Sequence, residues 1–287
     1  MKAIMKHELS LYFHSMTAYV FGAALLVVVG IGSMMYNLNA SVSNFEYVLS
    51  FGSIAFVIIV PILTMRIIAE ERKQKTDILL YSLPVSTTDI IAGKYLALLI
   101  VFAIPMAVVS VYPLIFSLFG DVYLLTAYGS IFAFIVLGAA LIAVGVFISS
   151  LTDNIGLAAG ICVAVILFNY FSVSLSEYVS STALGSAVVL IILTFLITLL
   201  IGKLIKNEMI STMLFAVIAV ATAVTYLINS TLFEGLVPNI MSKLSLFDQF
   251  SSFVNGAFDM EAMVFFISVI VFFLFLSVQS LEKRRYN

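Results

Sequence analysis

The side chains that could do acid–base, nucleophilic or metal chemistry are few, and their spacing forms no catalytic set. The two histidines, His7 and His14, have no cysteine or acidic partner at metal-ligand spacing, so we expect them at a solvated surface. Gly93 and Lys94 are not preceded by the glycine-rich run of a phosphate-binding loop, and Tyr95 stands where that loop needs Ser or Thr. We therefore predict no catalytic residue, no metal and no cofactor, and no ATP hydrolysis by this chain alone.

The stretch 66–95 mixes charged and apolar residues more densely than any other part of the chain. Charged and polar residues crowd its first part, and an apolar patch follows that consists of Ile78, Leu79, Leu80 and Leu83. Pro84 ends that segment, and three residues can then cap the next helix: Ser86, Thr87 and Thr88. We predict a short helix parallel to the membrane between two spanning helices. A solvated loop would explain the charges but not the patch, which is costly to expose to water.

The composition predicts the kind of fold that must hold this stretch. Of the 287 residues, 63% are apolar and 10% are charged, against roughly 25% charged in an ordinary soluble domain. This composition excludes a soluble enzyme, a disordered chain and a nucleic-acid binder, and it predicts a polytopic membrane protein. The single cysteine, Cys162, cannot form a disulfide within the chain and is expected to be a small buried apolar residue.

Eight gaps without Asp, Glu, Lys or Arg are each long enough for the about 20 apolar residues that cross a bilayer. We predict an all-α fold that forms one domain, residues 1–287, with about eight transmembrane helices. The predicted spans are 17–36, 48–68, 95–118, 124–150, 155–174, 186–202, 209–228 and 262–280. With both termini in the cytoplasm, Lys243 is the one cation among 13 Lys and Arg residues that falls outside, as the positive-inside rule favours. As an alternative, 186–202 and 209–228 form a re-entrant pair, which leaves six spans.

Two segments outside the spans have amphipathic patterns. Residues 1–16 are expected to form a helix in the inner membrane interface, whose apolar face consists of Met5, Leu9, Tyr12, Phe13 and Met16. Residues 229–261 form the one long extracytoplasmic loop. Its apolar residues recur at helical spacing and predict one short helix on the outer face: Leu244, Phe247, Phe250, Phe253 and Val254.

The predicted spans carry no ionisable side chain in their middle parts, which argues against a proton-driven pump. Gly156 and Gly160 form a Gly-x-x-x-Gly motif at the start of the fifth span, and this motif is typical of close helix packing. The remaining polar groups in the spans are expected to join helices.

The stretch 69–94 resembles the cytoplasmic coupling loop of ABC-2 type transporter permeases, in the branch of the gliding-motility and nitrous-oxide-reductase-maturation permeases. The residues that match the family pattern are Glu70, Glu71, Arg72, Thr76, Leu79, Leu80, Pro84, Val85, Ser86, Gly93 and Lys94. Lys75 replaces the usual Gly, and Asp77 stands near the usual Glu. Residues 8–20 and 247–285 resemble the two ends of the family, whereas 120–235 share only hydrophobicity with it.

The resemblance implies the permease subunit of an exporter, driven by a separate cytoplasmic ATPase. It also implies a second permease chain, as a homo- or heterodimer partner. It implies that the loop docks on the ATPase through charged residues, which include Lys73 and Asp77, and through Leu79, Leu80 and Leu83 as the apolar anchor. The substrate is expected to be hydrophobic or amphipathic. In the mechanical members of the branch, motion passes to an envelope protein, and the outer loop would then contact an extracytoplasmic partner through Phe247, Phe250, Phe253 and Asp259. The implied location is the bacterial cytoplasmic membrane, in contact with its lipids.

Two other functions stay open from the sequence. A membrane scaffold or assembly subunit would transport nothing and would have no ATPase partner. An ion-coupled secondary carrier is less favoured by the absence of intramembrane acids, although carbonyl and hydroxyl groups can hold Na⁺.

Overall fold

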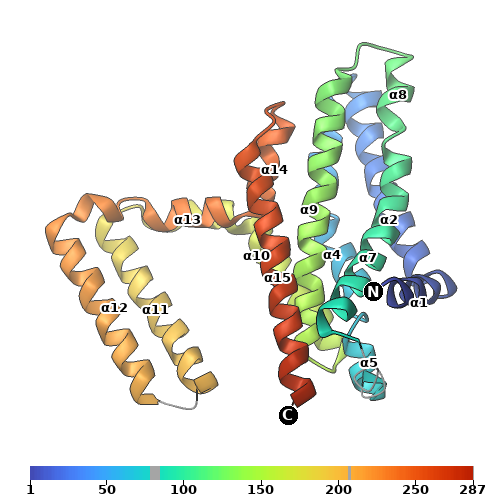
Figure 1. Ribbon diagram of the computed structural model, residues 1–287. Helices are drawn as coiled ribbons and strands as arrows, with labels where there is room; N and C mark the ends of the chain where they lie inside the picture. Colours follow the sequence, from blue (N-terminus) through green and yellow to red (C-terminus); the bar gives the residue numbers. More distant parts are fainter. Residues whose placement is uncertain (78–84, 206–207, 287) are drawn as a thin grey trace. The chain divides into compact units, whose positions relative to one another are not determined.

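The computed structural model describes residues 1–77, 85–205 and 208–286, and every regular element among them is helical (Figure 1). The predicted all-α class is therefore confirmed. The chain divides into two compact units, which are described separately: unit 1 contains Met1–Tyr170 and Gln249–Asn287, and unit 2 contains Phe171–Asp248.

Unit 1 consists of the N-terminal helices, the long central helices and the C-terminal helix. Its elements are α1 (Lys2–His14), α2 (Thr17–Ser33), the π-helical η1 (Met34–Asn39), α3 (Glu46–Ser53), α4 (Phe56–Thr64), α5 (Ala69–Gln74), α7 (Thr87–Val109), α8 (Tyr112–Ser117), α9 (Leu124–Leu151) and α15 (Met260–Tyr286). Two further helices begin in one unit and end in the other: α10 (Ile155–Ser176) and α14 (Leu246–Val254).

Five helices of the described residues are long and apolar enough to cross a membrane, so the prediction of a polytopic membrane protein is confirmed. They are Thr17–Asn39, Thr87–Ser117, Leu124–Leu151, Ile155–Ser176 and Met260–Arg284. Two bent pairs raise the number to seven if each is one span: Glu46–Ser53 with Phe56–Gln74, bent by 59°, and Thr212–Ile228 with Ser230–Leu244, bent by 119°. The sixth predicted span, 186–202, lies on α11 (Ala183–Ile205), of which Ala183–Phe195 is described as a shorter apolar helix. The number eight, the re-entrant alternative and the cytoplasmic termini remain predictions.

Helix α9 forms the core of unit 1, since 78% of its most apolar window is buried. It packs against α15, α4, α7 and α3, which surround it (Figure 1). Small residues permit this close packing, because a Cβ atom at Gly138 would lie 2.5 Å from the ring of Phe102. Phe56 links that ring to the next layer, with ring centroids 5.8 Å from Phe102 and 4.5 Å from Phe134. In a bilayer such close packing replaces the hydrophobic driving force that folds soluble proteins.

Unit 2 is built around a pair of packed helices, α11 and α12 (Glu208–Ile228). The short η2 (Ser230–Phe233) and α13 (Leu236–Leu244) follow and contact α11. A backbone hydrogen bond from the N–H of Gly235 to the carbonyl of Ser181, at 2.9 Å, ties the two parts together.

The two predicted amphipathic segments are helical, but each differs from its prediction in one respect. The first is α1, whose two buried residues are Glu8 and Tyr12, whereas Met16 of the predicted apolar face is 82% exposed. The segment 229–261, predicted as the outer loop, contains η2, α13 and α14 in place of one helix, and Leu244 ends α13. Ser245 separates α13 from α14. Its Oγ accepts a hydrogen bond from the N–H of Asp248 at 3.2 Å and so caps the start of α14.

Candidate functional site

The loop 69–94 begins with α5, a single charged helical segment held against the core by Ser149 of α9. The Ser149 hydroxyl oxygen accepts hydrogen bonds from the backbone N–H groups of Ile68, at 3.2 Å, and Ala69, at 3.1 Å. The same hydroxyl donates to the carbonyl of Met65 at 3.2 Å. These contacts satisfy groups that a helix start leaves unpaired, so α5 begins at a defined position. It ends at Lys75, whose φ of 59° is left-handed, which is the usual geometry of a helix C-terminus.

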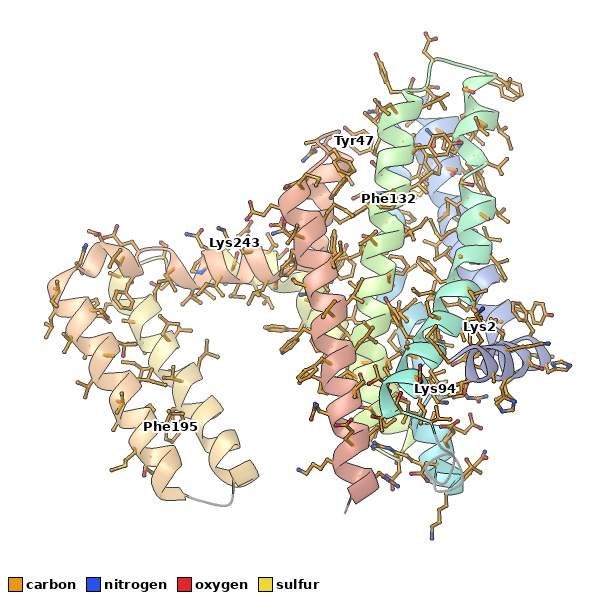
Figure 2. All side chains as sticks on the ribbon, in the orientation of Figure 1. Lys2, Tyr47, Lys94, Phe132, Phe195 and Lys243 are labelled. Atoms are coloured by element: carbon orange, nitrogen blue, oxygen red, sulfur yellow. The ribbon has the colours of Figure 1, made fainter. Side chains whose placement is uncertain are left out.

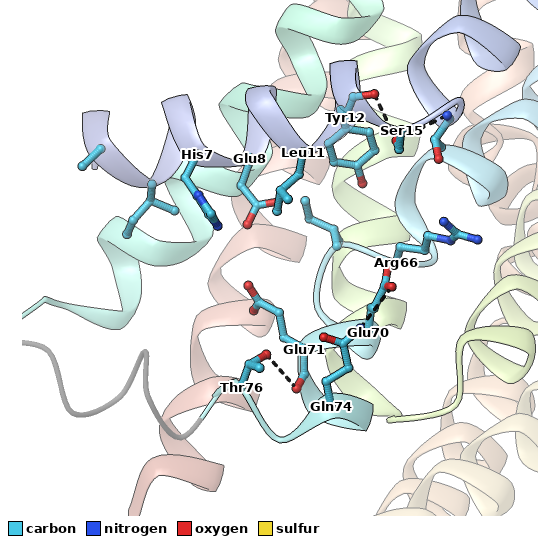
Figure 3. A pocket seen from close by; sticks show the side chains of 14 residues that line it. His7, Glu8, Leu11, Tyr12, Ser15, Arg66, Glu70, Glu71, Gln74 and Thr76 are labelled. Carbon is cyan, nitrogen blue, oxygen red and sulfur yellow. Dashed lines mark hydrogen bonds between the residues drawn. The ribbon is translucent and has the colours of Figure 1, made fainter.

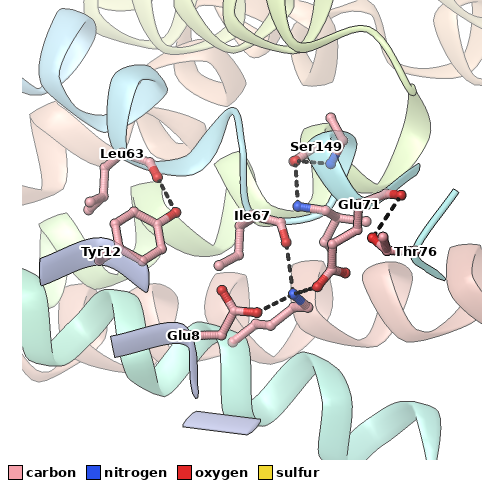
Figure 4. Close-up of polar contacts among 10 residues, drawn as sticks. Glu8, Tyr12, Leu63, Ile67, Glu71, Thr76 and Ser149 are labelled. Carbon is pink, nitrogen blue, oxygen red and sulfur yellow. Dashed lines mark hydrogen bonds and ion pairs between the residues drawn. The ribbon is translucent and has the colours of Figure 1, made fainter. Parts of the chain in front are cut away.

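Lys94 of α7 lies inside the helix bundle, whereas Lys2 projects from its surface (Figure 2). Its side chain is 1% exposed. The Lys94 Nζ donates to Glu8 Oε1 of α1 at 2.5 Å, to Glu71 Oε1 of α5 at 2.7 Å and to the carbonyl of Ile67 at 3.0 Å (Figure 4). An ammonium group has three N–H donors, and all three are used here. We call Glu8, Lys94 and Glu71 the charged triad.

The charged triad joins three separate elements through one buried cation. Its two carboxylates and one ammonium leave one net negative charge when all three groups are ionised. The two carboxylates differ in environment, because the Glu8 side chain is 6% exposed and that of Glu71 is 28% exposed. Removing one member of such a buried pair leaves an uncompensated charge, which is strongly destabilising. Glu8 is therefore the more dependent of the two carboxylates on Lys94.

The start of α1 packs closely on α7 beside the triad. A Cβ atom at Gly93 would lie 3.1 Å from the carbonyl oxygen of Met1 and 3.2 Å from the Cβ of Ile4. Only glycine avoids these short contacts without a shift of the neighbouring atoms. Gly93 therefore allows α1 to lie close enough to α7 for Glu8 to contact Lys94, the residue that follows Gly93.

Between α1 and α5 lies a cleft of about 880 Å³ (Figure 3). His7, Glu8 and Leu11 line it from α1, and Glu71 and Gln74 line it from α5. The cleft keeps α1 and α5 apart except at the charged triad, where Lys94 links them. Near the far end of α1, the Tyr12 hydroxyl donates to the carbonyl of Leu63 at 2.8 Å. Burial, with the nearby Glu8 carboxylate, raises the pKa of Tyr12 well above its usual value, so the phenol keeps the proton that it donates.

The end of α15 contacts the same loop from another side. Arg284 Nε lies 3.1 Å from Asp77 Oδ2, and the Asp77 side chain is only 5% exposed. The Thr87 hydroxyl donates to Glu282 Oε1 at 2.8 Å. Ser280 adds a hydrogen bond to the carbonyl of Ser150 in α9, at 2.9 Å. The two ends of the chain thus both attach to the loop 69–94.

Comparison with known families decides what kind of protein carries this arrangement. Residues 10–198 match a family described as ABC-2 family transporter protein. The chain belongs to the ABC-2 transporter family. No curated protein and no solved structure gives a match. The protein is accordingly a membrane subunit of an ABC transporter, and its candidate spanning helices make it a multi-pass membrane protein.

In this ABC-2 protein, the residues predicted to meet an ATPase divide by exposure. Lys73 and Thr76 are exposed, and Glu70 is half-buried. Arg72 and Lys94 are buried, so they face the bundle. The apolar anchor falls outside the described residues, which exclude Leu79, Leu80, Leu83 and Pro84.

The start of α7 agrees with the capping predicted at Ser86. Val85 precedes Ser86, which is the N-cap of α7. The Ser86 hydroxyl oxygen accepts a hydrogen bond from the N–H of Asp89 at 3.1 Å, as Ser, Asp and Thr caps commonly do. The helix therefore starts eight residues before the span predicted from residue 95.

The two glycines of the Gly-x-x-x-Gly motif, Gly156 and Gly160, lie in the first turns of α10. A Cβ atom at Gly160 would meet nothing within 4 Å, and one at Gly156 would meet only Asn154 at 3.5 Å, so among the described residues no other helix lies against these positions, and their role in helix packing stays a prediction.

The residues predicted to contact an extracytoplasmic partner are largely buried. The exposed fraction is 8% for Phe247 and 2% for both Phe250 and Phe253. Asp259 caps α15, accepting a hydrogen bond from the N–H of Glu261 at 2.8 Å. Their contact with a partner stays a prediction, and in this chain the phenyl rings are part of the interior.

Sequence reasoning missed Glu8, Glu282 and Arg284 as parts of this site. Glu8 did carry a signal, because it is the one acidic residue on an otherwise basic N-terminal segment and lies four residues before the buried Tyr12. Residues four apart share one face of a helix. The C-terminal residues carried no such signal, because a positively charged end also satisfies the positive-inside rule.

Proposed function

We propose that this chain is the non-catalytic permease subunit of an exporter in the bacterial cytoplasmic membrane, driven by a separate ATPase that docks on the loop 69–94. Two permease chains, identical or different, would form the transport path. The charge-free middle parts of the spans favour a hydrophobic or amphipathic substrate. As an alternative to moving a substrate, the same subunit would transmit ATP-driven motion to an envelope protein through the segment 229–261.

The observation that carries the proposal is the exposure of α5 together with its attachments. Helix α5 presents Lys73 and Gln74 to solvent, directly before the apolar residues of the loop. At the same time Ser149 and Lys94 hold it to the core. A segment that is charged outside and anchored inside can receive a push from a soluble partner and pass it to the spans.

The test is to purify the tagged chain from gently solubilised native membranes and to identify the proteins that co-purify by mass spectrometry. We expect a stoichiometric soluble ATPase with nucleotide-binding motifs. Isolation of the chain alone, or only with other membrane proteins even after crosslinking, would contradict the proposal and favour the scaffold or the ion-coupled carrier.

A second measurement examines the apolar anchor. We expect the double substitution Leu79→Asp and Leu80→Asp to abolish stimulation of the ATPase by the permease, because carboxylates cannot occupy an apolar groove without a large desolvation cost. The matched control is Leu151→Asp, at an exposed leucine that ends α9. Stimulation that survives the double substitution would remove the anchor from the docking site.

A further inference from the structure

A cleft separates α1 from α5, and the charged triad links the two helices beside it. Helix α1 packs along α7, whereas the cleft of about 880 Å³ lies between α1 and α5. Beside this cleft, Lys94 Nζ of α7 lies 2.7 Å from Glu71 Oε1 of α5 and 3.0 Å from the carbonyl oxygen of Ile67, which precedes α5 (Figure 4). Ser149 fixes the start of α5 against α9, and the Glu71–Lys94 contact is the side-chain link that joins α5 itself to the unit of α1 and α7.

The two ion pairs of the triad, Lys94 with Glu8 and Lys94 with Glu71, differ in how far they are shielded from water. The Glu8–Lys94 contact is 2.5 Å long between side chains that are 6% and 1% exposed. The Glu71 side chain is 28% exposed and borders the open cleft. Ion pairs gain strength as water is excluded from them. The link to α1 is therefore the better shielded of the two, and the link to α5 is the one that a displacement of α5 stretches more easily.

We propose that Lys94 is a positioning residue for ATPase coupling, which holds α5 at a set distance from the unit formed by α1 and α7. The proposal rests on the function proposed above and deepens it. Its consequence is that α1 is a working part of the coupling machinery and not only an anchor in the membrane interface. A push on the loop 69–94 reaches α1 and α7 through the Glu71–Lys94 contact and reaches α9 through Ser149.

The variant that separates coupling from folding is the neutral triad, which combines Glu8→Gln, Glu71→Gln and Lys94→Met. It keeps the side-chain volumes close to the native ones and leaves no buried charge without a partner. The complex with the ATPase is expected to assemble in normal yield. Stimulation of ATP hydrolysis by the permease is expected to fall by about tenfold, which is within the usual range of a coupling between two sites. Lys6→Met, at an exposed lysine of α1, is the matched control and keeps the stimulation.

A distance measurement follows the position of α5 directly. Spin labels at His7→Cys and Gln74→Cys, in a Cys162→Ser background, report the width of the cleft, since both residues are exposed and line opposite walls of it. In the native complex we expect the distance to change between the nucleotide-free and ATP-trapped states. In the neutral triad we expect a broad distribution that no longer responds to nucleotide.

Glu71→Gln alone serves if the neutral triad does not assemble, because it retains the Glu8–Lys94 pair. We expect it to broaden the cleft distance, whereas Lys2→Met, at an exposed lysine of α1 outside the cleft, leaves the distance unchanged. Native stimulation and a native distance response in these triad variants would overturn the role of Lys94 while leaving the permease function intact. Failure of the native chain to bind any ATPase would instead refute the function on which the role depends.

Discussion

Replacement of Lys94 by Met should lower the stability of the permease strongly, and the structure shows why. Methionine retains the apolar stem and nearly the same volume, so the change removes the ammonium group with little effect on packing. Three hydrogen bonds are lost, and two of them are to carboxylates. Glu8 is then a buried carboxylate without a cation, since its side chain is 6% exposed.

The expected loss is about 3–5 kcal/mol, the usual cost of breaking a buried ion pair on one side. Glu71 contributes less to it than Glu8, because Glu71 borders the cleft and can turn toward solvent. For a large domain, each kcal/mol lowers the melting temperature by about 2–4 °C, so the apparent transition should fall by roughly 10 °C.

The assay is thermal unfolding of the detergent-solubilised chain, followed by fluorescence-detected size-exclusion chromatography. Lys6→Met should leave the transition within the range of about 0.5 kcal/mol that is usual for surface changes. The double variant Glu8→Gln with Lys94→Met should recover much of the loss, because it removes the unpaired carboxylate together with the cation. A Lys94→Met chain that melts with the native one, or a double variant that is no better than the single one, would refute the charged triad as described.

Three further changes examine other parts of the structure. Gly138→Ala should destabilise the bundle by about 1–3 kcal/mol, because the new methyl group would lie 2.5 Å from the Phe102 ring; Phe102→Leu in the same chain should restore part of the melting temperature. Ser149→Ala should cost about 1 kcal/mol through lost capping of α5, and hydrogen exchange should show faster opening of residues 68–74 without change in α9; equal exchange in both chains would contradict this role. Arg284→Ala should cost about 1–3 kcal/mol by leaving the buried Asp77 carboxylate without its cation, and limited proteolysis should cut the end of α15 sooner; Asp77→Asn should reduce this effect, and unchanged proteolysis of Arg284→Ala would contradict the contact.

Hydrophobicity and charge position were sufficient to predict the membrane class and most of the long helices. A span is a local property, because about 20 consecutive apolar residues meet the thickness of the bilayer whatever the rest of the chain does. The cap at Ser86 was predictable for the same reason, since a hydroxyl pairs with a backbone N–H three residues away. The family resemblance in the loop 69–94 likewise rested on neighbouring residues, and the match over residues 10–198 confirmed it.

The contacts within the site were not predictable in this way. Glu8 and Lys94 are 86 residues apart, and Thr87 and Glu282 are 195 residues apart. In the sequence, Lys94 matched the family pattern of the coupling loop, and residues 1–16 were expected to form a helix with an apolar face toward the membrane. Neither pattern predicted that Lys94 would be buried against Glu8. The fold turned that helix so that Glu8 faces Lys94, because Gly93 allows α1 to lie close on α7.

The sequence alone determined that this chain is a helical membrane protein with a charged loop of the ABC-2 kind. These features depend on local composition and on motifs read along the chain. Only the tertiary structure decided which charged residues of the loop face outward and which are buried to hold α1, α5 and α7 together. The reason is physical: a charge is free to stay in water until the packing of distant helices removes the water, and its partner is then whichever opposite charge the fold brings within reach.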